Sequence, residues 1–247
     1  MRLWNGWGNE DSDLTMELSD GLRALLEALV GPGTALSQAT LSEVIALVPN
    51  TRLDDHPLIK TDPETRVRHA RGQSLPDWLE MHSGNVDTFP DGVAFPESSE
   101  QVRELLAHAK ENNLIVIPYG GGTSVVGHIN PETSDKPVLT IDMAKMNSML
   151  SIDTESQLAT FGAGAPGPVV EEELKKHGYT LGHFPQSWEL STLGGWVASR
   201  SSGQQSLHYG RMPAAKLKSP HLPLCVAAPY QTPLSLLMRH KTQHLCR

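Results

Sequence analysis

Apolar residues recur at helical spacing in several stretches of the chain. Residues 14–30 predict an amphipathic helix that ends at Gly31-Pro32-Gly33, and residues 40–48 predict a second, short helix. Residues 98–112 predict a third helix, with Ser98 and Gln101 as a capping box. The apolar face of this third helix consists of Val102, Leu105, Leu106 and Ala109.

The next stretch alternates short apolar runs with turn residues. Residues 114–118 are apolar on both faces, which predicts a strand buried beneath helices. Residues 137–142 predict another strand, and residues 149–161 predict a hairpin that turns at 154–156. Residues 168–177 predict a helix that ends at Gly178 and carries two i,i+4 ion pairs, Glu171–Lys175 and Glu172–Lys176. This mixture favours an α+β fold over strict alternation.

Residues 51–96 are polar and punctuated by prolines. They predict a mostly irregular arm with one helical turn near Asp77-Trp78-Leu79. Because a long structureless loop is improbable inside a compact domain, we expect this arm to wrap a partner surface. The sequence therefore predicts an N-terminal helical and irregular arm over residues 1–89, a domain over residues 90–212 and a tail over residues 213–247.

Composition excludes several classes of protein. The 247 residues carry a formal net charge of -8, which argues against a nucleic-acid partner. No apolar run approaches the roughly 20 residues of a transmembrane segment, and neither terminus has the features of a signal peptide or a peroxisomal address. Two cysteines make no disulfide framework, and no ligand spacing predicts a metal site. We expect a soluble, cytoplasmic protein.

The composition changes abruptly after Arg211. Glu189 is the last acidic residue, and both cysteines and five prolines lie at or beyond Pro213. This proline spacing blocks a long helix and disfavours strands. Two interpretations remain open, a flexible basic tail and an out-of-frame translation product, and the abrupt change favours the second.

Three consecutive glycines give the strongest chemical signal. Residues 120–122 follow the predicted strand and precede Thr123 and Ser124. Glycine lets a ligand approach the backbone closely, and successive N–H groups can converge on an anion. The loop is neither a Walker sequence nor GxGxxG. It predicts a phosphate or diphosphate site, with an ordinary turn as the alternative.

A second unusual stretch covers residues 185–205. Gly194-Gly195 permits close backbone approach, hydroxyl side chains are frequent, and Arg200 has the surroundings of a buried residue. A long ligand with phosphates, a sugar and a flat ring would need a second surface of this kind. Taken alone, such runs are most often turns.

Two motifs together resemble a known family. PYGGGTSV at 118–125 and GHFPQSWELSTLGGWVASRSSGQQSLHYGR at 182–211 resemble the FAD-binding, PCMH-type domain of the vanillyl-alcohol-oxidase superfamily. They are most similar to the alkyl-dihydroxyacetone-phosphate synthases and the bacterial FAD-linked oxidases. PDGVAFPESSEQV at 90–102 fits the start of that domain. The resemblance covers about residues 50–211 and implies a truncated PCMH-type domain preceded by a partly helical arm.

The resemblance implies FAD as the cofactor and assigns residues to it. The first loop would hold the diphosphate through the backbone of Pro118, Tyr119, Gly120, Gly121, Gly122, Thr123 and Ser124. The flavin and ribityl region would be lined by Gln186, Ser187, Trp188, Glu189, Leu190, Ser191 and Thr192. Further contacts to flavin and phosphates would come from Ser199, Arg200, Ser201 and Ser202. Thr123 stands where some relatives carry a flavin-linked histidine, so we expect non-covalent FAD.

The family continues past Arg211 with the rest of the FAD domain and a cap domain that bears the catalytic residues. This chain has no counterpart of them, so its catalytic residues are unknown and we expect weak FAD binding and no activity alone. The resemblance implies a transferase that exchanges acyl for alkyl on dihydroxyacetone phosphate in ether-lipid synthesis, or an oxidoreductase of 2-hydroxy acids or alcohols. A small-molecule or lipid-like substrate is implied, and a homodimer is left open. A non-enzymatic flavin- or nucleotide-binding fragment is the alternative.

Overall fold

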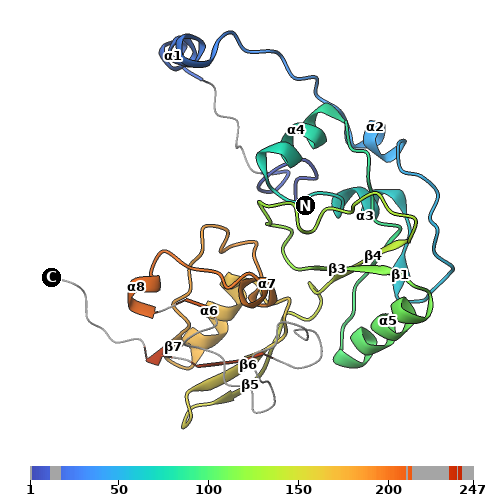
Figure 1. Ribbon diagram of the computed structural model, residues 1–247. Coiled ribbons are helices and arrows are strands. Elements are labelled where there is room, and N and C mark those ends of the chain that lie inside the picture. The colour runs from blue at the N-terminus through green and yellow to red at the C-terminus, as the bar shows by residue number, and fades with distance from the viewer. Residues whose placement is uncertain (1, 12–17, 210, 213–233, 238, 241–247) are drawn as a thin grey trace.

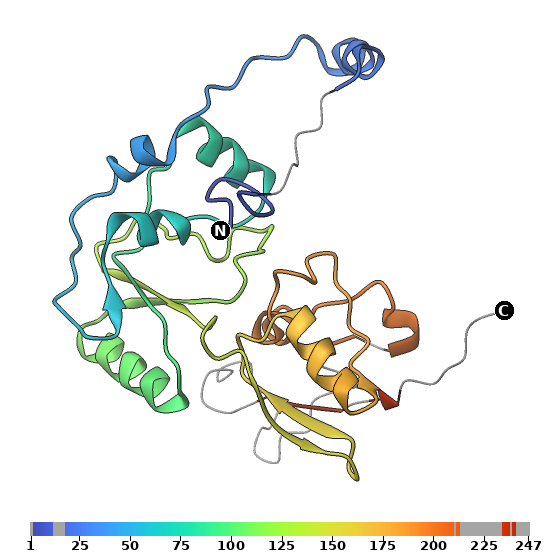
Figure 2. The same cartoon turned by 180° about the vertical axis from the view of Figure 1, so that it is seen from behind.

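The computed structural model describes residues 2–11, 18–209, 211–212, 234–237 and 239–240. The chain forms two adjoining parts, each with its own helices, the first built on a four-stranded sheet and the second on a three-stranded and a two-stranded sheet (Figure 1). The view from behind shows the same division, with one long N-terminal excursion reaching away from both parts (Figure 2). Helices, parallel strands and antiparallel strands all occur, as the α+β prediction requires.

The first sheet has the strand order β1-β2-β4-β3. The short strand β1 (Ile59–Lys60) runs antiparallel to β2 (Gly92–Ala94). Strands β2, β4 (Val138–Asp142) and β3 (Ile115–Tyr119) are parallel to one another. Helix α5 (Ser99–Glu111) makes the crossover from β2 to β3, which are parallel strands of one sheet on either side of β4.

The predicted strand at 114–118 is confirmed as β3, but its burial is not. β3 lies at the edge of the sheet, and Pro118 is exposed on it. An edge position tolerates the missing N–H of proline. Strand β4 is fully buried and has neighbours on both sides, and the same holds for the shorter strand β2.

Helix α5 confirms the third predicted helix, although its capping box is only half formed. The Ser98 hydroxyl accepts from the Gln101 N–H at 3.3 Å. The Gln101 side chain accepts instead from the N–H of Glu97 at 2.7 Å. Val102, Leu105 and Ala109 are buried, and the first two pack with residues of β2 and β4.

The prediction of a mostly irregular arm over residues 51–96 is wrong at helix α3 (Pro63–Arg68), and its one helical turn near residues 77–79 is part of a longer helix, α4 (Leu75–Ser83). Asp62 caps α3, and Ser74 caps α4 through a reciprocal box with Asp77. Prolines at the first helical positions suggested turns. They begin helices instead, because the N–H that proline lacks has no partner there.

The arm packs on its own chain. Helix α2 (Leu41–Ile45), the second predicted helix, joins α3 and α4 in one apolar cluster. The buried members of this cluster are Val44, Val67, Ala70, Met81, Val86 and Phe89. The buried Arg66 donates to the carbonyls of Pro90 at 2.6 Å and Pro49 at 2.7 Å. Among the described residues, the surface that the arm wraps is therefore its own first sheet, and the boundary at residue 89 stays a prediction.

The first predicted helix is observed as α1 (Asp20–Val30), capped by Ser19, and residues 14–17 of that prediction lie outside the described part of the chain. None of its residues is buried, and both views show it apart from the two sheets (Figure 1, Figure 2). No helix among the described residues has the length and apolar character that crossing a membrane requires.

The second sheet contains the predicted hairpin, formed by β5 (Met149–Asp153) and β6 (Leu158–Phe161). Helix α6 (Gly167–Lys176) confirms the predicted helix, and Gly178 follows it with φ of 80°. The predicted pairs on α6 form no direct ion pair among the described residues, although the pKa of Lys176 is raised first by its hydrogen bond to Glu173 and also by the charge of Glu172. Lys176 contacts Glu173 at 2.6 Å, whereas Glu171 accepts from the Thr180 hydroxyl and from two N–H groups just beyond it.

Two short strands come from the predicted tail, which the proline spacing had disfavoured. β8 (Leu234–Leu237) pairs with β6, and β9 (Arg239–His240) pairs with β7 (Tyr179–Thr180). Tertiary pairing overrides the local signal at these positions. The remaining residues from 213 onward lie outside the described part, so the reading frame of the tail stays an open prediction.

Candidate functional site

The glycine loop begins where β3 ends. Residues 120–124 follow Tyr119, at the carboxyl end of a strand parallel to β4. Ligands of open parallel sheets typically bind beyond these strand ends. The loop thus occupies a place in the fold that suits a binding site.

The structure brings the first loop against the second. A Cβ on Gly120 would overlap the Thr192 hydroxyl, and a Cβ on Gly121 would overlap the carbonyl of Leu190. Gly122 has φ of 65° and lies against the Tyr119 phenol. The glycines are therefore required by protein packing, whereas the sequence suggested ligand approach as their reason.

Three carbonyl groups in the glycine loop and just before it accept hydrogen bonds from other parts of the chain. Tyr119 O accepts from Met143 N at 3.0 Å, and Ser124 O accepts from Gln73 N at 2.6 Å. Gly121 O accepts from the Arg2 guanidinium at 2.5 Å. Within the described residues, no N–H group of residues 120–124 donates a hydrogen bond. These N–H groups can therefore receive the oxygens of an anion.

The second loop, residues 186–192, is a compact turn. Ser187 O accepts from the N–H groups of Leu190 and Ser191 and from the Ser191 hydroxyl, and that hydroxyl accepts from Trp196 Nε1. The Thr192 hydroxyl is buried without a partner among the described residues. A buried hydroxyl of this kind costs free energy unless a further group satisfies it. It faces the first loop at Gly120.

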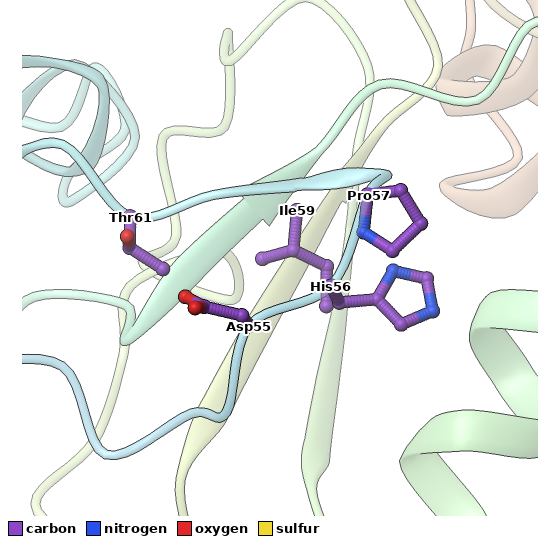
Figure 3. A pocket seen from close by; sticks show the side chains of 5 residues that line it. All are labelled: Asp55, His56, Pro57, Ile59 and Thr61. Carbon is purple, nitrogen blue, oxygen red and sulfur yellow. The ribbon is translucent and has the colours of Figure 1, made fainter.

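A cavity of about 280 Å³ adjoins the second loop. Its lining residues are Trp7, Phe184, Pro185, Gln186, Trp188, Glu189 and Gln204. Its lining combines three aromatic side chains with three polar side chains, and both kinds of group occur in small-molecule sites. A second cavity, of about 330 Å³, is shown in Figure 3. It is lined by Asp55, His56, Pro57, Ile59 and Thr61 around β1, and it contains no residue of either loop.

The predicted contacts at residues 199–202 are not assembled with the glycine loop. The Ser199 hydroxyl donates to Gly195 O, and the Ser201 hydroxyl bonds His183 Nε2 at 2.8 Å. The Ser202 hydroxyl donates to Ser206. Arg200 is exposed, with φ of 52°, so the expectation of a buried arginine is wrong. The spacing alone could not show that the short helix α7 (Leu193–Ala198) turns this side chain outward.

A buried polar pair, which no sequence motif indicated, lies beside Tyr119, the residue before the glycine loop. His69 Nε2 lies 3.0 Å from Asp142 Oδ2, and His69 Nδ1 lies 2.7 Å from the carbonyl of Thr65. A carbonyl only accepts, so the contact with Thr65 is a hydrogen bond donated by Nδ1. The His69 ring packs on Tyr119. Burial raises the pKa of Tyr119 to about 12, so the phenol is neutral.

The chain matches the family described as FAD binding domain over residues 90–215, just over half of its length. The chain therefore belongs to this family of FAD-binding domains, and FAD is its cofactor. The residues present fit that group, since unpaired N–H groups suit a diphosphate and an aromatic cavity suits a flat ring.

The chain is also similar to individual proteins of known sequence or structure. Alkyldihydroxyacetonephosphate synthase of Dictyostelium discoideum is 41% identical over 152 residues, which are 62% of this chain and 25% of that protein. The FAD-linked oxidoreductase YgcU of Escherichia coli is 37% identical over 140 residues, 57% of this chain and 28% of that protein. A solved structure of an alkyldihydroxyacetonephosphate synthase superposes with a TM-score of 0.77 at 28% identity, covering 98% of this chain and 54% of the other. The chain thus spans about a quarter of these curated relatives.

Proposed function

We propose that the glycine loop binds the FAD diphosphate through the N–H groups of residues 120–124. The observation that carries this proposal is the arrangement of the loop, in which the carbonyls of Tyr119, Gly121 and Ser124 are bonded and the N–H groups are not. Fixed N–H groups stabilise an anion without reorganisation when it binds. FAD would contribute the flavin ring, which carries the chemistry of such enzymes.

The second loop is proposed to orient the ribityl chain and the flavin. The Thr192 hydroxyl needs a partner, and Gln186, Trp188 and Glu189 line the adjoining cavity. The contribution of Ser199 to Ser202 has less support, because three of the four side chains bond within the protein. Binding is proposed to be non-covalent. His128, the histidine nearest to the loop in sequence, bonds the Ser124 hydroxyl at 3.0 Å.

For the whole protein we propose an enzyme similar to alkyldihydroxyacetonephosphate synthase, which exchanges an acyl for an alkyl group on a small phosphorylated, lipid-like substrate. The support is the identity of 33–41% to relatives with that name. A homodimer and a cytoplasmic location belong to the same proposal. The similarity to YgcU favours a second candidate, an FAD-linked oxidoreductase.

Equilibrium dialysis against excess FAD tests cofactor binding by this chain, with riboflavin as the matched control that lacks the diphosphate. We expect FAD, bound weakly, to accumulate on the protein side and riboflavin not to do so. Equal retention of both ligands, or of neither, would refute the diphosphate site. In the longest expressible form, fatty-acid release from an acyl dihydroxyacetone phosphate supports the transferase, and dye reduction by a 2-hydroxy acid supports the oxidoreductase.

A further inference from the structure

The first residues of the chain fold back on themselves. Arg2 and Asn9 form an antiparallel bridge, and Leu3 N donates to Gly8 O at 3.0 Å. Gly8 has φ of 102°, which favours glycine at this turn. We call residues 2–9 the N-terminal clasp. Its conformation is defined by its own hydrogen bonds, although it contains no helix or extended strand.

The clasp is attached to the first sheet's part of the molecule at two points. Arg68 of α3 donates to the carbonyl of Arg2 at 2.9 Å. Trp4 packs against the apolar cluster of α2, α3 and α4. These contacts place the Arg2 side chain at the glycine loop, where its guanidinium donates to Gly121 O at 2.5 Å.

The clasp also reaches the second loop. Trp7 lines the cavity of about 280 Å³ together with Gln186, Trp188 and Glu189. One short segment therefore touches both loops of the proposed cofactor site, with a cation at the first loop and an indole at the second. Neither contact follows from the glycine or serine motifs, which lie more than a hundred residues away in sequence.

The bond from Arg2 has a geometric consequence. In a planar trans peptide, the carbonyl and the N–H point in opposite directions. A donor that holds Gly121 O therefore directs the N–H of Gly122 away from the clasp. Met143 N and Gln73 N hold Tyr119 O and Ser124 O in the same way. Arg2 is the side-chain donor among these three anchors, so a substitution can remove its bond and leave the backbone intact.

We propose that the N-terminal clasp is part of the cofactor site, with Arg2 as a positioning residue that fixes the Gly121–Gly122 peptide for the FAD diphosphate. This inference rests on the proposed diphosphate site. The clasp acts on the backbone of the loop and closes one wall of the flavin cavity through Trp7. It thereby couples the two loops into one binding surface.

The test compares Arg2→Ala, Arg2→Lys and the control Arg23→Ala, which removes an exposed arginine on α1. The full chain carries any purification tag at its C-terminus. Loss of one charge-assisted hydrogen bond predicts roughly 10-fold weaker FAD binding in Arg2→Ala. Arg2→Lys, which keeps a donor, recovers part of the affinity, and Arg23→Ala keeps the wild-type value.

A second readout separates positioning from a general structural role. In the FAD-free wild-type protein, the ¹⁵N order parameter of Gly122 is expected in the range of a rigid backbone, about 0.85. In Arg2→Ala it falls below about 0.6, while the order parameters of α6 do not change. If wild-type protein binds FAD and Arg2→Ala binds it equally well, the clasp inference is wrong and the diphosphate site stands. If wild-type protein shows no saturable FAD binding, the proposed site itself fails.

Discussion

The contact between the two loops makes Gly121 a position where one added methyl group cannot fit without moving backbone. A Cβ there would lie 2.7 Å from the Leu190 carbonyl carbon and 3.0 Å from Ser191 Cα. Both neighbours are backbone atoms, so no side-chain rotation can relieve the overlap. The φ angle of Gly121 lies outside the left-handed region, so the expected effect is steric.

The size of the effect follows from these distances. Carbon atoms in contact lie about 3.5–4.0 Å apart, so one loop must retreat by roughly 1 Å. Inserting a methyl group into a packed contact typically costs about 1–3 kcal/mol. If the cost falls on the arrangement that binds FAD, the Kd rises about 5- to 150-fold.

The assay is an FAD titration of ¹⁵N-labelled Gly121→Ala followed at the loop amides, which measures weak affinities. Gly21→Ala is the matched control, because its Cβ on α1 would meet no atom within 4 Å. We expect the control to keep the wild-type Kd and to gain about 0.5–1 kcal/mol of stability in α1. A wild-type Kd for Gly121→Ala would show that the loop contact does not form the cofactor site.

Three further predictions concern buried polar groups. Thr192→Val should raise the melting temperature of the FAD-free protein, because it removes a buried hydroxyl without a partner, and it should weaken FAD binding about 5-fold. A lower melting temperature together with tighter FAD binding would refute a role for this hydroxyl. Burial raises the pKa of Asp91, but hydrogen bonds from Arg52 and the Val138 N–H outweigh it, and the net pKa is lowered. The stabilisation is present above the unfolded-state pKa of about 3.9 and is lost as pH falls through the lower folded-state pKa, so urea unfolding should show Asp91→Asn destabilised at pH 7 and progressively less so below about pH 4. Glu171→Gln should cost about 1–3 kcal/mol in the same assay, because the carboxylate accepts three hydrogen bonds, and a neutral result would contradict that role.

Local signals in the sequence predicted the elements with strong periodicity, which are about half of those observed. The hairpin of β5 and β6 and the helices α5 and α6 have strong periodicity and clear end signals, and the structure confirms them. Helix α3 was missed and α4 was predicted only as one turn, because Asp62-Pro63 and Pro76-Asp77 resemble turn signals as much as helix starts. Glu171 accepts hydrogen bonds from backbone N–H groups at residues 181 and 182 and does not pair with Lys175. This preference depends on tertiary structure, so the local sequence could not predict it.

The candidate site was predictable only in part. The glycine and serine motifs predicted the two loops, but they did not predict the direct contact of Gly121 with Leu190. Arg2 was invisible to sequence reasoning, since no local pattern links it to a residue 119 positions away. The same holds for the pair of His69 and Asp142, which lie on different elements and meet only after the sheet forms.

Hydrogen exchange at the amides of residues 120–124 tests the central claim most directly. These N–H groups have no hydrogen-bond acceptor among the described residues, so they should exchange rapidly without ligand. The account predicts that FAD slows their exchange selectively and that riboflavin, which lacks the diphosphate, does not. Binding of FAD that leaves these amides unprotected would contradict the assignment of the glycine loop to the diphosphate.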